Sequence, residues 1–216
     1  RLRPEGQASA VATSIDRLAI YFDHDAWIWE KQALTKARPI AGDIGLSNKI
    51  QKLINSNVNH NHPKDSLVTA ISEMRQRIQK QQKPASQWHL RQIAGGLTDI
   101  DLLIQAWRLQ YGALFSGSGQ PARVILQTLY DNGVIDKSCY EDMTGASKCF
   151  NEIHHSLRLT LGSMVPTTDK LPHGLHHFIL QRIGFPNKAR FQHHYDLSIN
   201  TVIQRINAYL IMADKP

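Results

Sequence analysis

The chain has 216 residues, enough for one large domain or for one domain and part of another. It carries 25 Lys and Arg against 18 Asp and Glu, and the formal charge of +7 predicts attraction to an anionic partner such as a nucleotide, a nucleic acid or an acidic protein. No apolar run approaches a membrane span, no signal peptide is visible, and the two cysteines lie far from any metal-like pairing, so we predict a reduced, cytoplasmic protein with no membrane partner.

The first 14 residues have the character of β-strands, because Arg1-Leu-Arg-Pro alternates, a turn follows, and Ser9 to Thr13 is again strand-like. Two strands do not form a stable sheet, so we expect them to be the end of a sheet whose other strands precede residue 1. Since the chain also opens on arginine rather than methionine, we expect it to be a piece of a longer protein.

Helical periodicity dominates the rest of the chain and predicts a mainly α fold, a helical bundle with a short β remnant at its N-terminus. Ser14 is expected to cap the first helix, Asp65 or Ser66 the fourth, and Pro121 to occupy the first position of the sixth. The expected helices cover about residues 15–22, 25–38, 46–54, 67–78, 99–110, 121–131, 137–161, 175–183 and 188–212.

Between these helices, the polar run 55–64 and residues 162–174 are expected to be loops. Residues 88–92 are interpreted as a short extended piece that leads into the fifth helix. That helix follows two glycines, Thr98 can cap it, and Asp99 lies in its first turn, where the helix dipole favours an anion. Apolar residues almost all round it predict a buried, central helix. Asp101 is out of place there unless it is solvated or pairs with an arginine.

The densest group of unusual residues is the segment from Trp27 to Arg38. On a continuous helix, Trp29 and Lys36 would share one face with Gln32, and Glu30 and Arg38 would share another with Leu34. One interpretation is structural, with packed tryptophans and a surface ion network between Glu30 and Arg38. The other directs Lys36 and Arg38 towards phosphates, which suit a guanidinium fork.

Eleven histidines raise the possibility of a metal site, since His173, His176 and His177 have helical spacing. No cysteine pair or His-Glu-x-x-His pattern accompanies them, so we favour solvated or core-edge histidines and predict no metal site. Cys149 lies near His154 in sequence, but no third orienting group is evident, and a buried free thiol is the better interpretation.

Four ordered motifs together resemble the bacterial glutamine synthetase adenylyltransferases, in particular their C-terminal, adenylylating half. The motifs are Arg1-Leu-Arg3-Pro4-Glu-Gly6; Trp27-Ile-Trp29-Glu30-Lys-Gln32-Ala-Leu-Thr-Lys36-Ala-Arg38 with Gly42-Asp43; Gly95-Gly96-Leu-Thr-Asp99-Ile100-Asp101-Leu102; and Glu152-Ile-His154-His155. The family usually has Glu and Phe where this chain has Asp101 and Leu102.

The resemblance implies transfer of AMP from ATP to a tyrosine of glutamine synthetase, with Mg²⁺ held by carboxylates and control by the P-II regulatory protein. It implies that Arg1 and Arg3 lie near the nucleotide, whereas five motif residues have no assigned role: Glu30, Lys36, Arg38, Asp99 and Asp101. The expected metal carboxylates would precede residue 1, so we expect this chain alone to hold neither Mg²⁺ nor ATP and to be inactive.

The resemblance also divides the chain into the end of a nucleotidyltransferase domain, residues 1–43, and a helical bundle, residues 44–216. The alternative function is a non-catalytic docking module that binds glutamine synthetase or the P-II protein. Nucleic-acid binding through the excess charge is the third hypothesis, and we disfavour it because no nucleic-acid motif accompanies the charge.

Overall fold

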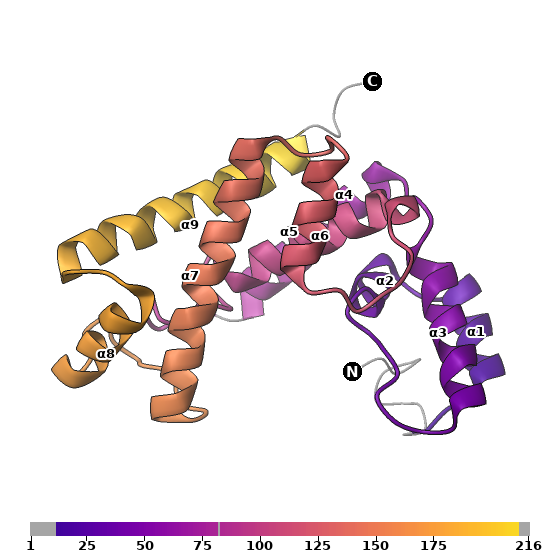
Figure 1. Cartoon of the computed structure of the whole chain (residues 1–216), viewed down its shortest axis with the longest axis horizontal. Coiled ribbons are helices and arrows are strands. Elements are labelled where there is room, and N and C mark those ends of the chain that lie inside the picture. Colours follow the sequence, from indigo (N-terminus) through magenta and orange to yellow (C-terminus); the bar gives the residue numbers. More distant parts are fainter. Residues whose placement is uncertain (1–11, 82, 212–216) are drawn as a thin grey trace. The chain divides into compact units, whose positions relative to one another are not determined.

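A computed structural model describes residues 12–81 and 83–211 of the chain (Figure 1). All regular structure in these residues is helical, and no strand occurs among them. The predicted strands fall mostly on residues 1–11, outside the described part, so the β remnant stays a prediction. The helices are α1 (Ile15–His24), α2 (Ile28–Leu34), α3 (Ile44–Val58), α4 (Lys64–Gln81), α5 (Leu97–Gln110), the 3₁₀ turn η2 (Gly112–Leu114), α6 (Ala122–Asp131), α7 (Lys137–Leu161), α8 (His173–Ile183) and α9 (Lys188–Ile211).

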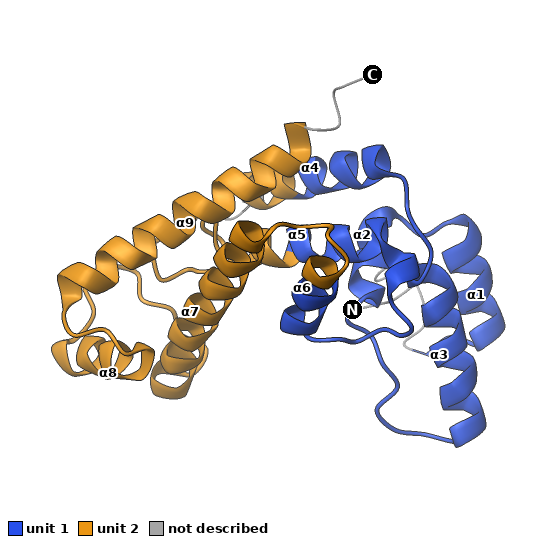
Figure 2. Ribbon diagram, turned by 45° about the horizontal axis from the view of Figure 1, so that its top comes forward, with its two compact units in different colours: residues 1–74, 102–128 blue, residues 75–101, 129–216 orange. Residues whose placement is uncertain are grey.

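The helices belong to two compact units (Figure 2). In the described part of the chain, unit 1 contains residues 12–74 and 102–128, and unit 2 contains residues 75–81, 83–101 and 129–211. This division into compact units does not test the predicted domain boundary between residues 43 and 44, so that boundary stays a prediction.

Unit 1 is built on α3, against which α1 and α2 pack. Its core holds one cluster of buried apolar side chains that are widely separated in sequence. The cluster consists of Phe22, Leu34, Ile54, Val58, Leu67 and Leu109. Burial of these side chains contributes roughly 1.5–3 kcal/mol each and holds the short helices α1 and α2 in place.

Unit 2 is built on the long helix α7, which packs against α8 and α9 (Figure 1). Its core is aromatic: Trp88 stacks on Phe191 with 6.3 Å between ring centroids, and Tyr195 lies against both Phe191 and Phe150. The Trp88 indole donates a hydrogen bond to the carbonyl of Asp169, so the irregular segments before α5 and α8 are fastened to each other.

Several predicted elements are confirmed. The hydroxyl of Ser14 accepts the Arg17 N–H at 3.3 Å and caps α1. Helix α7 has the predicted bounds, and α9 begins at Lys188 as expected. The side chains of α5 are buried almost all round, as its sequence predicts.

The prediction of a second helix from near Asp25 towards Pro39 was wrong, because α2 covers only Ile28–Leu34. Glu30 fixes its start by capping the extended residue Trp27. Its end is set at Thr35, whose carbonyl leaves the helix to accept a hydrogen bond from another segment. Lys36 and Arg38 are therefore not on a helix.

Other predicted boundaries were also wrong. Helix α3 continues to Val58 instead of ending before the polar run at residue 55, because Asn57 and Val58 are buried. Helix α4 starts at Lys64, before the predicted caps. Residues 88–92 form turns rather than an extended piece. Pro121 precedes α6, and α8 starts two residues early, at His173.

No helix in the described part of the chain combines the length and the apolar character that crossing a bilayer requires.

Candidate functional site

The first candidate site is the loop that follows α2 in unit 1, which we call the basic loop, residues 35–38. Thr35 is buried, whereas the side chains of Lys36 and Arg38 are exposed. Two cations two residues apart on an exposed loop can both approach one phosphorylated ligand. Both predicted cations are therefore exposed, although not on the helix that the sequence suggested.

A second loop, residues 117–119, fastens the backbone of the basic loop. The Gly119 N–H donates to the Thr35 carbonyl at 2.9 Å, and the Ser118 hydroxyl donates to the Ala37 carbonyl at 2.9 Å. Gly119 has φ +72°, and a Cβ there would lie 3.3 Å from the Cβ of Arg38, so glycine suits this position both in conformation and in space. These bonds fix the backbone from which Lys36 and Arg38 project.

Arg108, on α5, holds the 117–119 loop in turn. Its guanidinium is fully buried and donates to the carbonyls of Val58 and Gly117, each at 2.7 Å, and to the Asn59 side chain. It also lies 4.1 Å from the centre of the Phe115 ring. Burial lowers the pKa of Arg108 to about 10, so the group stays charged at neutral pH and faces the carbonyl end of α3, where the helix dipole favours a cation. Sequence analysis missed Arg108; its only signal is a cation within an otherwise apolar helix.

Glu30 does not pair with Arg38, as one interpretation of the sequence proposed. Its carboxylate is buried and accepts from the Tyr21 hydroxyl at 2.7 Å and from the Trp27 N–H at 3.0 Å. Glu30 is thus a capping residue that ties α2 to α1. The expectation that Trp27 and Trp29 are packed was wrong, because their side chains are 67% and 40% exposed.

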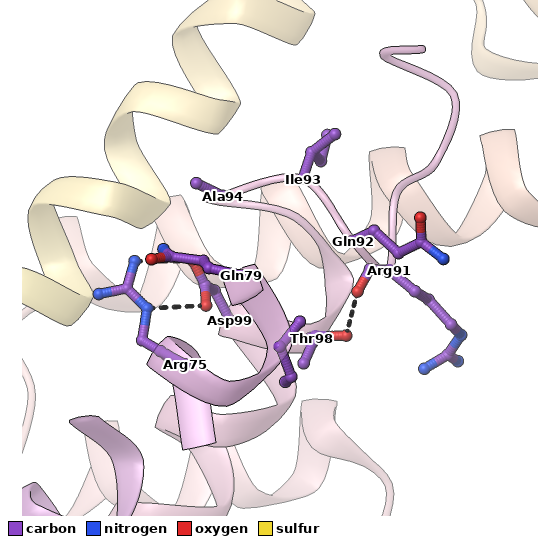
Figure 3. Close-up of a pocket in the computed structure, with 9 residues that line it drawn as sticks. Arg75, Gln79, Arg91, Gln92, Ile93, Ala94, Thr98 and Asp99 are labelled. Atoms are coloured by element: carbon purple, nitrogen blue, oxygen red, sulfur yellow. Dashed lines mark hydrogen bonds and ion pairs between the residues drawn. The ribbon is translucent and has the colours of Figure 1, made fainter. Parts of the chain in front are cut away.

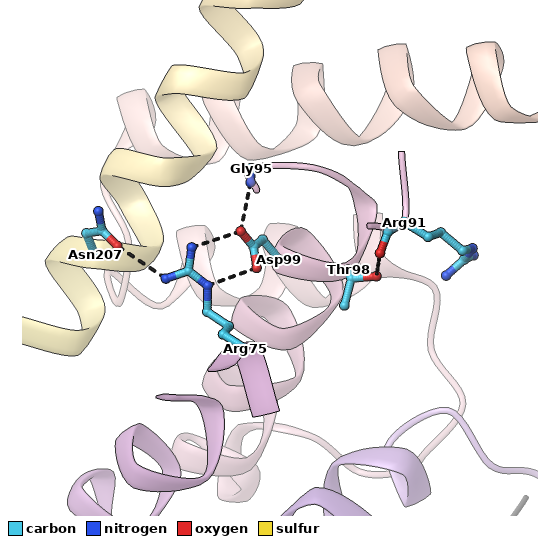
Figure 4. Close-up of polar contacts among 6 residues, drawn as sticks. All are labelled: Arg75, Arg91, Gly95, Thr98, Asp99 and Asn207. Atoms are coloured by element: carbon cyan, nitrogen blue, oxygen red, sulfur yellow. Dashed lines mark hydrogen bonds and ion pairs between the residues drawn. The ribbon is translucent and has the colours of Figure 1, made fainter. Parts of the chain in front are cut away.

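The second candidate site is the glycine–aspartate motif at the start of α5 in unit 2 (Figures 3 and 4). Asp99 forms a bidentate ion pair with Arg75 of α4, with both N···O distances at 3.0 Å, and also accepts the Gly95 N–H at 2.8 Å. Arg75 donates a further hydrogen bond to Asn207 of α9. The side chains of Arg75 and Asp99 are 14% and 9% exposed. The motif therefore fastens α4, α5 and α9 of unit 2 to one another.

Thr98 does not cap α5, contrary to the prediction. The helix already begins at Leu97, so Thr98 lies inside it, and the Thr98 hydroxyl donates instead to the Arg91 carbonyl at 2.7 Å (Figure 4). Asp101 pairs with Arg91 at 3.7 Å, which confirms the arginine-pair interpretation, but both side chains are partly exposed. The pocket beside Asp99 holds about 20 Å³, room for about one water molecule rather than for a substrate (Figure 3).

Among residues 12–81 and 83–211, no group of three or more His, Cys, Asp or Glu side chains could hold a metal ion. His173 and His177 stack on α8 with 6.5 Å between their rings. Cys149 is a buried free thiol, as predicted, and burial raises its pKa to about 11. Glu152, from the fourth motif, pairs with Arg182 at 2.7 Å.

The geometry thus distributes the predicted residues between two separate sites. Lys36 and Arg38 lie in unit 1, and Asp99 and Asp101 lie in unit 2. Arg1 and Arg3 fall outside the described residues, so their predicted role at the nucleotide stays a prediction.

Comparison with known families assigns the chain to a class. Residues 1–53 match the model described as glutamate-ammonia ligase adenylyltransferase, and residues 66–211 match the model described as GlnD PII-uridylyltransferase. Both descriptions denote nucleotidyltransferases. Relatives that match across both segments decide between them, and the chain belongs to the glutamine synthetase adenylyltransferase family.

These relatives are named bifunctional glutamine synthetase adenylyltransferase/adenylyl-removing enzyme. The protein from Bartonella quintana is 30% identical over 89% of this chain and 19% of its own length. The protein from Chromobacterium violaceum is 30% identical over 79% of this chain and 19% of its own length. The protein from Brucella suis is 28% identical over 91% of this chain and 20% of its own length. The chain therefore spans about a fifth of the length of these relatives.

Proposed function

We propose that this chain is part of a nucleotidyltransferase that transfers AMP from ATP to a tyrosine of glutamine synthetase. Family membership supports the reaction class, and the relatives' names support the substrate. The observation that carries the proposal within this chain is the basic loop, which presents Lys36 and Arg38 on a backbone fastened by Ser118 and Gly119. Control by the P-II regulatory protein is part of the proposal.

In this reaction the tyrosine oxygen attacks the α-phosphorus of ATP, the bond to the β-phosphate oxygen breaks, and pyrophosphate leaves while the phenol loses its proton. Negative charge on the phosphate oxygens must be balanced throughout. The guanidinium of Arg38 and the ammonium of Lys36 can supply this positive charge, and the backbone that carries them is held by the hydrogen bonds from Ser118 and Gly119.

Three acids of the family motifs, Glu30, Asp99 and Asp101, do not fit a Mg²⁺ site. Glu30 is buried and accepts hydrogen bonds from Tyr21 and Trp27, and Asp99 is engaged by Arg75 and Gly95. Asp101 faces Arg91. We therefore assign these acids to architecture and derive no metal step through them.

The test uses the longer protein that contains this chain, with Mg²⁺, ATP and purified glutamine synthetase. Arg38→Ala and Lys36→Ala should each lower kcat/KM for adenylylation about tenfold, as expected for loss of one charge-assisted contact, with unchanged thermal unfolding. Lys49→Ala, which removes an exposed cation from α3 of the same unit, is the matched control. Unchanged kcat/KM in both loop variants would overturn the role of the basic loop.

A second candidate function is protein docking, and one observation favours it. Unit 1 exposes large apolar side chains on its first three helices and on the segments between them: Ile20, Trp27, Trp29, Ile40, Ile44 and Leu46. Exposed aromatic and aliphatic side chains next to cations are typical of protein interfaces. Retention of glutamine synthetase or the P-II protein by the immobilised chain, weakened by Trp27→Ala, would support docking, and retention of neither would argue against it.

A further inference from the structure

A cavity with charged walls lies among α7, α8 and α9 of unit 2, apart from the two candidate sites. We call it the α7–α8–α9 pocket. It encloses about 470 Å³, within the range of small-molecule sites. Its wall on α7 is formed by one helix face, and the remainder comes from the end of α8 and from α9. The lining residues are Gly145, Lys148, Cys149, Glu152, Arg182, Ile183, Phe185 and His194.

Two cations at this pocket, Lys148 and Arg182, have hydrogen-bond donors that no other described residue uses. Lys148 makes no hydrogen bond or ion pair with any other described residue. Arg182 binds Glu152 only through its Nε, at 2.7 Å, which leaves the two terminal NH₂ groups of its guanidinium for another acceptor. With one carboxylate against two cations, the pocket has a net positive charge and favours an anionic group, and the planar guanidinium suits a phosphate.

The pocket is also lined by two aromatic rings. The ring centroids of Phe185 and His194 lie 5.0 Å apart, with the ring planes tilted by 40°. We call this pair of rings the aromatic platform, because a planar base can stack against an aromatic ring. Cys149 contributes a neutral thiol, since burial raises its pKa to about 11, so the floor carries no competing negative charge. The pocket thus combines an anion-binding end with a surface that suits a flat ring.

Gly145 gives a further indication that the pocket is kept open. It lies inside α7, where glycine is less favourable than any other residue except proline. A Cβ at this position would meet no atom within 4 Å, so no packing contact within the described residues requires glycine. A larger side chain would instead enter the space that Gly145 leaves beside Lys148.

We propose that the α7–α8–α9 pocket binds a nucleoside monophosphate, with its phosphate at Lys148 and Arg182 and its base against Phe185 and His194. This inference goes beyond the proposed function and does not depend on it, because it concerns ligand binding by unit 2 and not AMP transfer.

Calorimetric titration of the full chain with AMP tests the proposal directly. We expect saturable 1:1 binding, about tenfold weaker after Lys148→Ala and unchanged after Lys137→Ala, which removes an exposed lysine of the same helix that pairs with Glu141. Gly145→Leu should abolish binding without lowering the unfolding temperature, since leucine favours the helix more than glycine does.

Three results would overturn the proposal. They are no heat of binding at millimolar AMP, equal affinity in the Lys148→Ala and unmodified proteins, and full binding by Gly145→Leu. Inorganic phosphate that binds as tightly as AMP would overturn the role of the aromatic platform, whereas His194→Ala weakening AMP but not phosphate would support it.

Discussion

The two aspartates of the α5 motif provide a sharp test, because they lie two residues apart and the structure gives them different roles. Asp99 is buried in a bidentate pair with Arg75, whereas Asp101 makes a longer, partly exposed contact with Arg91. Asp99→Asn keeps an acceptor for the Gly95 N–H but leaves the Arg75 guanidinium, 14% exposed, without its counter-charge. Removal of one partner of a buried pair costs roughly 3–5 kcal/mol, and loss of an exposed pair roughly 0–1 kcal/mol.

We therefore expect Asp99→Asn to lower the free energy of unfolding by about 3 kcal/mol and Asp101→Asn by no more than about 0.5 kcal/mol. In a chain of this size 1 kcal/mol corresponds to about 2–4 °C in Tm, so the two variants should be readily distinguished. Urea unfolding followed by circular dichroism gives the free energies, and a double-mutant cycle with Arg75→Met gives the coupling.

Equal losses in the two aspartate variants, or a coupling energy between Arg75 and Asp99 below about 0.5 kcal/mol, would show that the pair does not hold α4 and α5 together.

Three further predictions concern single sites. Arg108→Met should destabilise unit 1 by about 2–4 kcal/mol, because buried acceptors lose their donor, whereas Arg123→Met at an exposed position of α6 should change the free energy by no more than about 0.5 kcal/mol; urea unfolding measures both. Gly95→Ala should cost clearly more Tm than Gly133→Ala, since both have positive φ but only at Gly95 would a Cβ lie 2.4 Å from a backbone oxygen. Burial lowers the pKa of His62, so the unfolded chain binds more protons than the folded chain at acidic pH; stability should fall as pH drops below about 6.5, and His62→Gln should reduce that slope in unfolding curves at pH 5 to 7.

The sequence predicted the helices well where a helix carries its own pattern. Helix α7 has a capping aspartate, Asp136, a long apolar stripe and a terminal glycine, Gly162, and its bounds agree with the prediction. The predicted end of helix α2 was wrong because that end depends on Gly119, far along the chain. The Gly119 N–H binds the Thr35 carbonyl, which therefore leaves the helical hydrogen-bond pattern. No local periodicity contains that information.

The sites show the same limit. Family motifs pointed to Asp99, yet its partner Arg75 appeared in the sequence only as one of several cations on an amphipathic helix. Lys36 and Arg38 were singled out, but the support they receive from Arg108 through residues 117–119 joins segments that no spacing rule connects. Contacts between distant segments decided which motif residues are exposed and which are structural.

We propose that this chain serves the adenylylation of glutamine synthetase, and one measurement tests that proposal most directly. Glutamine synthetase is incubated with Mg²⁺, ATP labelled at the α-phosphate and the longer protein that contains this chain, and the modified peptide is sequenced by mass spectrometry. We predict label on a tyrosine, at a rate reduced by Arg38→Ala and unaffected by Lys49→Ala. Glutamine synthetase that stays unlabelled with the unmodified protein would contradict the claim.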